Sequence, residues 1–185
     1  MCLRIGDNMT QINLGLNSIF NPYKRTQSNS QLNTQNEKVF NSNKPKQVYM
    51  MTDDMLYSGG NGTGLSFYIK YADESTEDDP IVVAKGVDEK GKEFEQRIAI
   101  NDINPSSASI VEMRALEAHF NVDKGGGLSS LPKGIGKMGL NDRRNFLSMF
   151  EDAVQDLQKL ARYDLSQFYK RNLATYENIA KRFKK

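Results

Sequence analysis

The residue types best suited to chemistry in this chain are one histidine and a dense run of carboxylates. His119 has no Cys or Ser partner in a recognisable nucleophile motif, and spacing alone does not define a catalytic triad. The run 73–79 holds five carboxylates, which suit a hard cation, but it lacks the alternating spacing and central Gly of a calcium-binding loop. We therefore predict no catalytic residue, no metal site and no cofactor, and the pattern favours a binding protein over an enzyme.

Two glycine-rich segments are candidates for holding phosphate groups. Residues 133–139 read KGIGKMG, but Met138 stands where a phosphate-binding loop needs Ser or Thr, and Leu131 stands where its first Gly belongs. Residues 58–65, SGGNGTGL, join two predicted strands and open no helix, so the dinucleotide-binding fingerprint does not apply. We interpret both segments as loops, with an anion bound where a helix opens at Asn141 as the alternative.

Strands are predicted across residues 48–104, where strand-like runs alternate with turns. Ile81 to Val87 and Lys92 to Ile100 flank Asp88-Glu89-Lys90-Gly91, which indicates a β-hairpin with Gly91 at positive φ. Ser109 and Glu112 predict a capping box at the start of the next helix. The expected fold class is α+β: an antiparallel meander of three or four strands across 48–101, covered on one face by a helix over 107–120.

Apolar side chains recur at helical spacing through the last part of the chain, 141–183. This pattern predicts a long amphipathic helix or a helical hairpin, with the break expected at Tyr163-Asp164-Leu165-Ser166. The apolar stripe either packs in the chain's own core or binds a partner protein, and the spacing leaves both readings open. The candidate partner-binding residues on the stripe are Phe146, Phe150, Leu157, Leu165, Phe168, Tyr176 and Ile179.

The expected domain organisation has four parts. They are a flexible N-terminal arm (1–47) rich in Asn, Gln, Ser and Thr, an α+β body (48–120), a Gly-rich linker (121–140) and a helical region (141–185). An apolar island from Ile12 to Phe20 makes the arm either a docking peptide or a tail that packs weakly on its own domain. Translation is expected to start at Met1 or at Met9.

Charge is distributed unevenly, although the net charge is only +2. Residues 164–185 hold six basic and two acidic side chains, which makes nucleic acid an alternative, less favoured partner. The candidate contacts to nucleic acid or another anion are Lys170, Arg171, Lys181, Arg182, Lys184 and Lys185.

Neither a membrane span nor a secretory signal is expected. No run approaches 18 apolar residues, and Met1 to Phe20 lacks the apolar core of a signal peptide. Cys2 is the single cysteine, so no internal disulfide can form. We expect a cytoplasmic protein, with export without a cleaved signal as the alternative.

Residues 78–120 contain an Asp-Asp-Pro opening, Gly-Lys-Glu-Phe-Glu at the hairpin exit, and Asp-Ile-Asn-Pro before a helix with Glu-Met-x-Ala-Leu. In these features the block resembles uncharacterised small proteins of low-GC Gram-positive bacteria, which have no assigned function. The resemblance covers 43 of the 185 residues. It implies a bacterial origin and a β-hairpin-plus-helix module, and it implies no activity.

The functional expectation is a non-catalytic protein-binding or assembly module. It would act through its amphipathic C-terminal helix and its N-terminal docking arm, on a protein partner or on a second copy. The alternatives are a nucleic-acid-binding protein and a substrate of a specialised secretion system.

Overall fold

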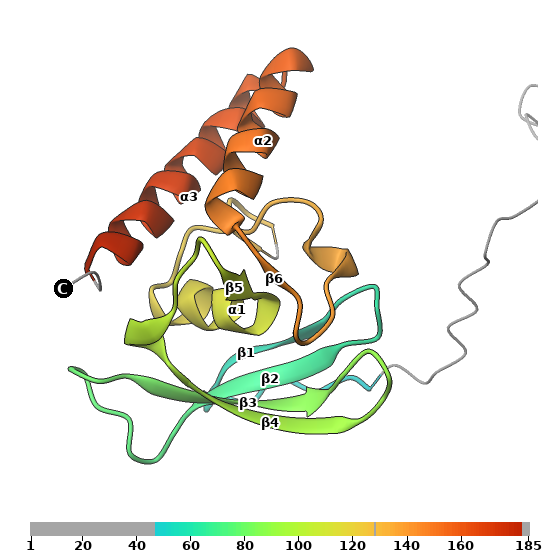
Figure 1. Ribbon diagram of the computed structural model, residues 1–185, viewed down its shortest axis with the longest axis vertical. Helices are drawn as coiled ribbons and strands as arrows, with labels where there is room; N and C mark the ends of the chain where they lie inside the picture. The colour runs from blue at the N-terminus through green and yellow to red at the C-terminus, as the bar shows by residue number, and fades with distance from the viewer. Residues whose placement is uncertain (1–46, 128, 183–185) are drawn as a thin grey trace, which may run out of the picture. The chain divides into compact units, whose positions relative to one another are not determined.

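A computed structural model describes residues 47–127 and 129–182 of the chain. These residues belong to one compact unit, in which a β-sheet, a central helix and a pair of C-terminal helices follow one another (Figure 1). Residues 1–46 of the predicted arm, including its apolar island, lie outside the described residues, as do Lys184 and Lys185.

The sheet is an antiparallel meander of four strands in the order β1-β2-β3-β4, which confirms the predicted fold class. The hairpin between β3 and β4 turns at Gly91, whose φ of +81° is the left-handed conformation that glycine adopts without strain. Strand character was expected from residue 48 onward, but residues 48–51 form no strand, and the sheet begins only after a turn at residues 52–55. The strands are β1 (Met55–Gly60), β2 (Ser66–Tyr71), β3 (Ile81–Val87) and β4 (Glu93–Ala99).

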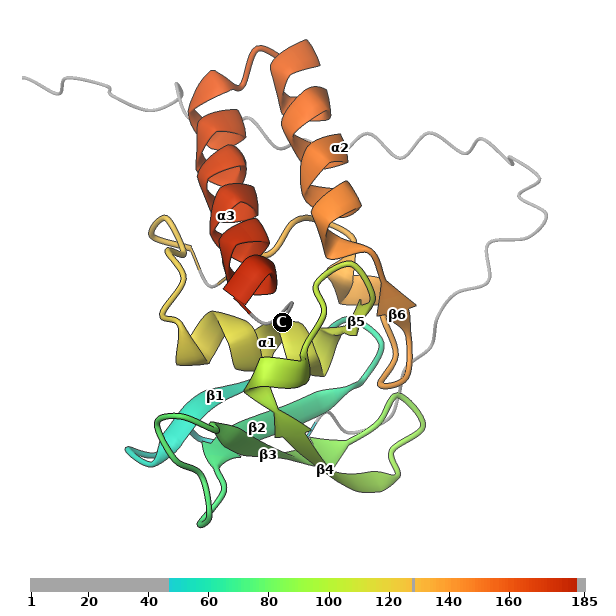
Figure 2. The same cartoon turned by 60° about the vertical axis from the view of Figure 1, so that its left-hand side comes forward.

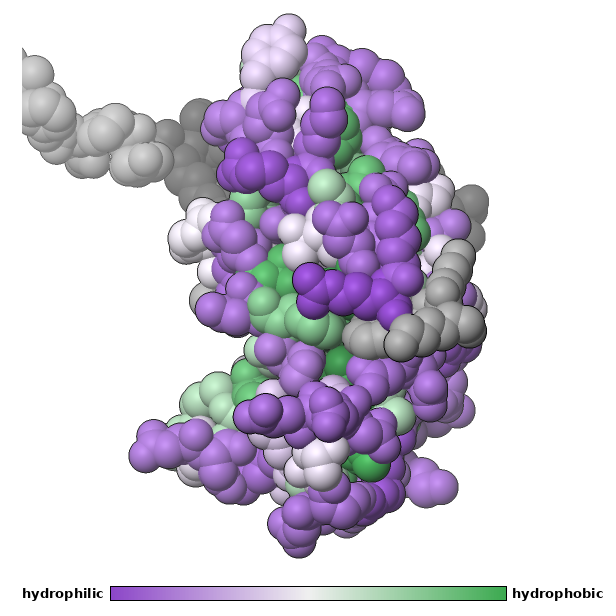
Figure 3. All heavy atoms as spheres, turned by 90° about the vertical axis from the view of Figure 1, so that its left-hand side faces the viewer, coloured by the Kyte–Doolittle hydropathy of each residue, from purple (hydrophilic) through white to green (hydrophobic). Residues whose placement is uncertain are grey.

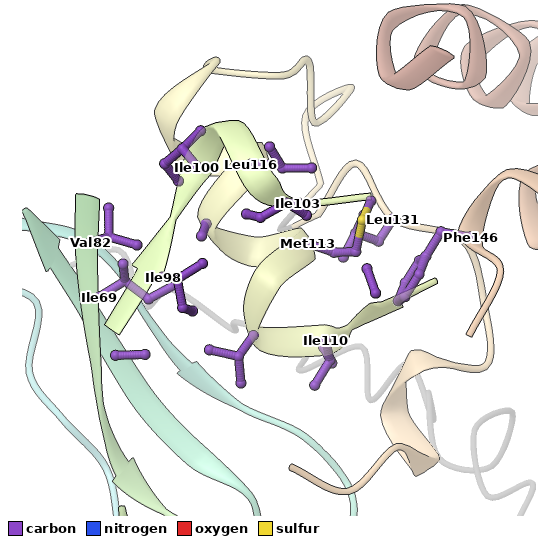
Figure 4. Close-up of a cluster of buried hydrophobic side chains, with 14 of the residues drawn as sticks. Ile69, Val82, Ile98, Ile100, Ile103, Ile110, Met113, Leu116, Leu131 and Phe146 are labelled. Carbon is purple, nitrogen blue, oxygen red and sulfur yellow. The ribbon is translucent and has the colours of Figure 1, made fainter. Parts of the chain in front are cut away.

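Helix α1 (Ile110–His119) covers one face of this sheet. It begins with the predicted capping box, in which Ser109 Oγ accepts from the Glu112 N–H and Glu112 Oε2 accepts from the Ser109 N–H. A one-turn helix η1 (Ile100–Asp102) and a two-residue strand β5 (Ala108–Ser109) link β4 to α1, and β5 pairs with β6 (Arg143–Arg144). Figure 4 shows apolar side chains of the sheet and of α1 meeting, with Phe146 on the far side of α1.

The C-terminal region is a helical hairpin of α2 (Phe146–Lys159) and α3 (Tyr163–Arg182). The two helices lie side by side and extend away from the sheet (Figure 2). The predicted position of the break is wrong, because residues 163–166 form the first turn of α3 and the break lies at 160–162. Ala161 adopts φ +54° there, its N–H donates to the Gln158 carbonyl, and the Arg162 N–H donates to the Leu157 carbonyl. This pair of hydrogen bonds is a Schellman motif, which ends a helix without Gly or Pro.

The segment expected to be a linker, 121–140, packs within the fold. Val122, Leu131 and Met138 are buried in the core cluster. A short helix η2 (Ile135–Lys137) lies beside the turn that joins β1 to β2, where Asn61 Nδ2 donates to the Met138 carbonyl at 2.6 Å. The two glycine-rich segments are therefore in contact with each other.

Candidate functional site

The predicted apolar stripe of the C-terminal region lies mostly inside the molecule. Phe146, Phe150 and Tyr176 are completely buried, and Phe168 and Ile179 are at most 9% exposed. Leu157 and Leu165, nearer the far end of the hairpin, are half-buried. The spacing left open whether the stripe packs in the core or binds a partner. Five of its seven residues are buried in the chain's own fold.

A buried ion pair on α1 begins a polar network that reaches the hairpin. Arg114 Nη1 donates to Glu117 Oε2 at 2.6 Å and to Ser129 Oγ at 2.7 Å. The other carboxylate oxygen of Glu117 accepts from the Ser130 N–H. Glu117 is 1% exposed, and a buried carboxylate is tolerated only when its oxygens are paired in this way.

The same network continues into α3. Ser130 Oγ lies 2.6 Å from the Tyr176 hydroxyl, and Asn172 Nδ2 donates to the carbonyls of Ser130 and Asp123, each at 3.1 Å. Burial raises the pKa of the Tyr176 phenol well above its usual range, so this group stays neutral. The network therefore ties α3 to the segment that follows α1.

This network contains residue types found in active sites, but it is closed to solvent. Ser130 and Tyr176 have no exposed surface, and Glu117 and Arg114 are nearly as buried. A substrate cannot reach these side chains without opening the fold. We therefore assign the network a positioning role, in which it fixes the hairpin on the body. Within the described residues, Arg114 Nε is the one buried side-chain nitrogen or oxygen without a hydrogen-bond partner.

Sequence reasoning missed this network. The available signal was that Arg114 and Glu117 stand three residues apart among the apolar residues of α1. Charged residues at such positions are buried only as a pair, so the spacing could have indicated an internal ion pair. No sequence pattern marked Ser130 as the partner of Tyr176, because 46 positions separate them.

The distal end of the hairpin is the part of α2 and α3 that exposes large apolar side chains. Leu160 is 71% exposed and Tyr163 is 63% exposed, and they flank the Schellman turn. On the face of the molecule shown in Figure 3, where the hairpin is uppermost, most of the side chains on the hairpin are hydrophilic. The charged residues beside this tip are of both signs: Asp156 pairs with Lys159 at 3.2 Å, and Arg162 lies 3.8 Å from Asp164.

The predicted basic contacts lie on α3 where the structure describes them. Lys170, Arg171, Lys181 and Arg182 are all exposed, and no ion pair engages them within the described residues. Four positive charges on one helix form a basic surface, since only Asp164 and Glu177 oppose them on α3.

A shallow recess of about 520 Å³ surrounds the single histidine. Its lining includes Glu77, Asp78 and Asp102, with His119 at the end of α1 and Arg182 at the end of α3. His119 Nδ1 is hydrogen-bonded to the Tyr71 hydroxyl at 2.9 Å, and burial lowers the pKa of this imidazole. Across residues 47–127 and 129–182, no three His, Cys, Asp or Glu side chains gather as metal ligands.

No protein-family model, curated protein or solved structure matches this chain. The resemblance of residues 78–120 to small Gram-positive proteins therefore stays a prediction. None of the helices in the described part of the chain combines the length and apolarity needed to cross a lipid bilayer.

Proposed function

We propose that this chain is a non-catalytic protein-binding module that engages its partner through the distal end of the α2–α3 hairpin. The observation that carries the proposal is the exposure of Leu160 and Tyr163 at the two ends of one tight turn. Exposed large apolar residues at the tip of a fixed element are typical of interaction sites, and Tyr is enriched among residues that dominate binding energy.

The chemistry of the tip supports a folded protein as the partner. Leu160 and Tyr163 would fill an apolar recess on a folded protein, with each buried side chain contributing about 1.5–3 kcal/mol before the costs of association. The pairs Asp156–Lys159 and Arg162–Asp164 would form a polar rim of mixed charge around this contact. A partner surface with complementary charges would raise the association rate and select against mismatched competitors.

The buried polar network supports the same function. An element whose base is held by Tyr176, Ser130 and Asn172 presents its tip in one orientation, and little ordering is left to occur on binding. The docking arm of the sequence-based hypothesis lies outside the described residues, and the role proposed for the hairpin does not depend on it.

Site-specific photo-crosslinking in the native cells tests this function. A photoreactive phenylalanine analogue at Tyr163 should give one discrete crosslinked protein, and Leu160→Gln in the same chain should abolish it. The matched control places the analogue at Lys133, an exposed position in the segment between α1 and α2. The proposal fails if position 163 gives no discrete product, or gives the same products as position 133.

A second candidate function is nucleic-acid binding through α3, favoured by its four exposed basic residues. If phosphates are contacted, affinity for DNA or RNA should fall steeply as salt rises. Lys170→Gln combined with Arg171→Gln should weaken binding and reduce the slope of log K against log salt by about 2. A flat fluorescence-polarisation signal at low salt would dismiss this candidate.

A further inference from the structure

Strand β4 is a long and regular edge strand of the sheet. It pairs with β3 in an unbroken register from Ile81↔Ala99 to Val87↔Glu93, and no strand of the described residues pairs with its other side (Figure 1). The opposite edge, β1, is interrupted by a register shift near Met55 and ends in two glycines. Proteins commonly blunt exposed edges with bulges, prolines, short strands or charged side chains. β4 has seven regular residues without the first three devices, and its charged residues Glu93, Glu95 and Arg97 are of both signs.

The ladder with β3 determines which backbone groups of β4 are available. The Asp88 N–H donates to the Lys92 carbonyl at 2.8 Å, and the Ile100 N–H donates to the Pro80 carbonyl at 2.9 Å. Hydrogen-bonded pairs recur at every second residue of an antiparallel ladder, so the even-numbered residues of β4 bond to β3. The backbone groups that point to the open edge are those of Glu93, Glu95, Arg97 and Ala99.

We propose that β4 pairs antiparallel with β4 of a second copy of this chain, about a two-fold axis at Gln96. In this register Glu95 lies directly opposite Arg97 of the second copy, and the reciprocal pair forms on the other side of the axis. The residues of both pairs point their backbone groups to the open edge. The register that pairs opposite charges is therefore also one in which the backbone hydrogen bonds can form.

The neighbouring registers are unfavourable because they oppose like charges. A two-fold axis at Glu95 brings two glutamates together, and an axis at Arg97 brings two arginines together. An axis at Phe94 places Glu93 against Glu95. Like charges directly opposite each other destabilise a strand pair, whereas opposite charges stabilise it. Among these registers, only the axis at Gln96 pairs β4 over its whole length without placing like charges opposite each other.

The two faces of the sheet also fit this register. Phe94, which is half-buried on the side of α1, would lie opposite Ile98 of the second copy, and so extend the apolar face across the axis. On the outer face, Lys85 contacts Glu95 and Glu74 contacts Arg97 within one chain. These side chains would join the intermolecular pairs in one alternating network. The result is one continuous sheet made from both meanders.

Charge reversal tests the pairing with a specific rescue. Glu95→Arg or Arg97→Glu alone should raise the dimer dissociation constant about tenfold or more, measured by sedimentation equilibrium on the full chain. The double variant should dimerise like the wild type. An equimolar mixture of the two single variants should form a mixed dimer, because each Arg then faces a Glu. Glu151→Arg, with the same change in charge on α2, should leave dimerisation unchanged.

A backbone variant separates pairing from folding. Glu95→Pro removes an N–H that points to the open edge and is not used by β3, so the chain should stay folded by circular dichroism and become monomeric. The proposal is overturned if the wild type keeps its 20.9 kDa monomer mass at high concentration, or if neither single charge reversal weakens the dimer. It is also overturned if the mixture of single variants stays monomeric.

Discussion

The hydroxyl of Tyr176 on α3 lies 2.6 Å from the hydroxyl of Ser130, and neither side chain has any surface exposed to solvent. Ser130 is in turn bonded through its N–H to Glu117 on α1. The central helix and the last helix, which do not follow each other in the chain, are thus joined through one serine. This connection fixes the base of the hairpin whose tip carries Leu160 and Tyr163.

Removing the Tyr176 hydroxyl should destabilise the fold. Tyr176→Phe leaves the buried Ser130 hydroxyl without its partner, at a cost of about 1–2 kcal/mol in the free energy of unfolding measured by urea titration. Ser130→Ala should cost a similar amount, because it leaves the buried Tyr176 hydroxyl without its partner. The double variant should lose clearly less than the sum, because no unpaired hydroxyl remains. Tyr163→Phe, at an exposed position, is the control and should change stability by less than about 0.5 kcal/mol. Additive losses would show that the two hydroxyls do not interact.

The turn between α2 and α3 should be improved by glycine. Ala161 adopts φ +54°, a left-handed conformation in which Cβ lies too close to the following carbonyl oxygen. Ala161→Gly should therefore stabilise the chain by about 0.5–1 kcal/mol, after allowance for the greater freedom of glycine in the unfolded state. The matched control, Ala153→Gly within α2, should destabilise by about 1 kcal/mol. A loss of stability from Ala161→Gly would contradict the assigned turn.

The features that could be predicted from sequence were those encoded over a few neighbouring residues. The β3–β4 hairpin follows from Gly91, and the start of α1 follows from Ser109 and Glu112, because turns and caps depend on local backbone geometry. The end of α2 was misplaced since Ala161 carries no signal for a left-handed conformation. The partner of Tyr176 was missed since contacts between distant residues depend on tertiary packing.

The packing of β2 against β3 depends on the absence of a side chain at Gly86. A Cβ atom there would overlap the Ser66 carbonyl and lie 2.6 Å from the Phe67 Cα, both of which are backbone atoms that cannot easily move. Gly86→Ala should cost about 3 kcal/mol or more in thermal or urea unfolding. Gly136→Ala is the control, because a Cβ there meets nothing within 4 Å. Equal effects of the two substitutions would contradict the close strand packing.

Stability should fall as His119 becomes protonated. Burial holds the pKa of this imidazole below its ordinary value of 6.5, so the unfolded chain binds the proton more readily than the folded chain. Above the ordinary value both states are neutral and the histidine has no effect on the pH dependence. Lowering the pH from roughly 7 to 5 should reduce the free energy of unfolding, and His119→Gln should make this decline smaller. NMR titration measures the pKa directly, and a value at or above 6.5 would disprove the prediction.

The orientation of the hairpin relative to the sheet can be tested by double electron–electron resonance, which measures the distance between two spin labels. Spin labels at Gln158, on the distal part of α2, and at Lys92, on the β3–β4 turn, would be attached in a Cys2→Ser background. The labelled chain would be diluted in an excess of unlabelled chain, so that only distances within one chain are measured. A hairpin held by the buried network predicts a single narrow distance distribution. A broad distribution, or one with several maxima, would mean that the hairpin moves relative to the sheet and would contradict the presentation of Leu160 and Tyr163 in one orientation.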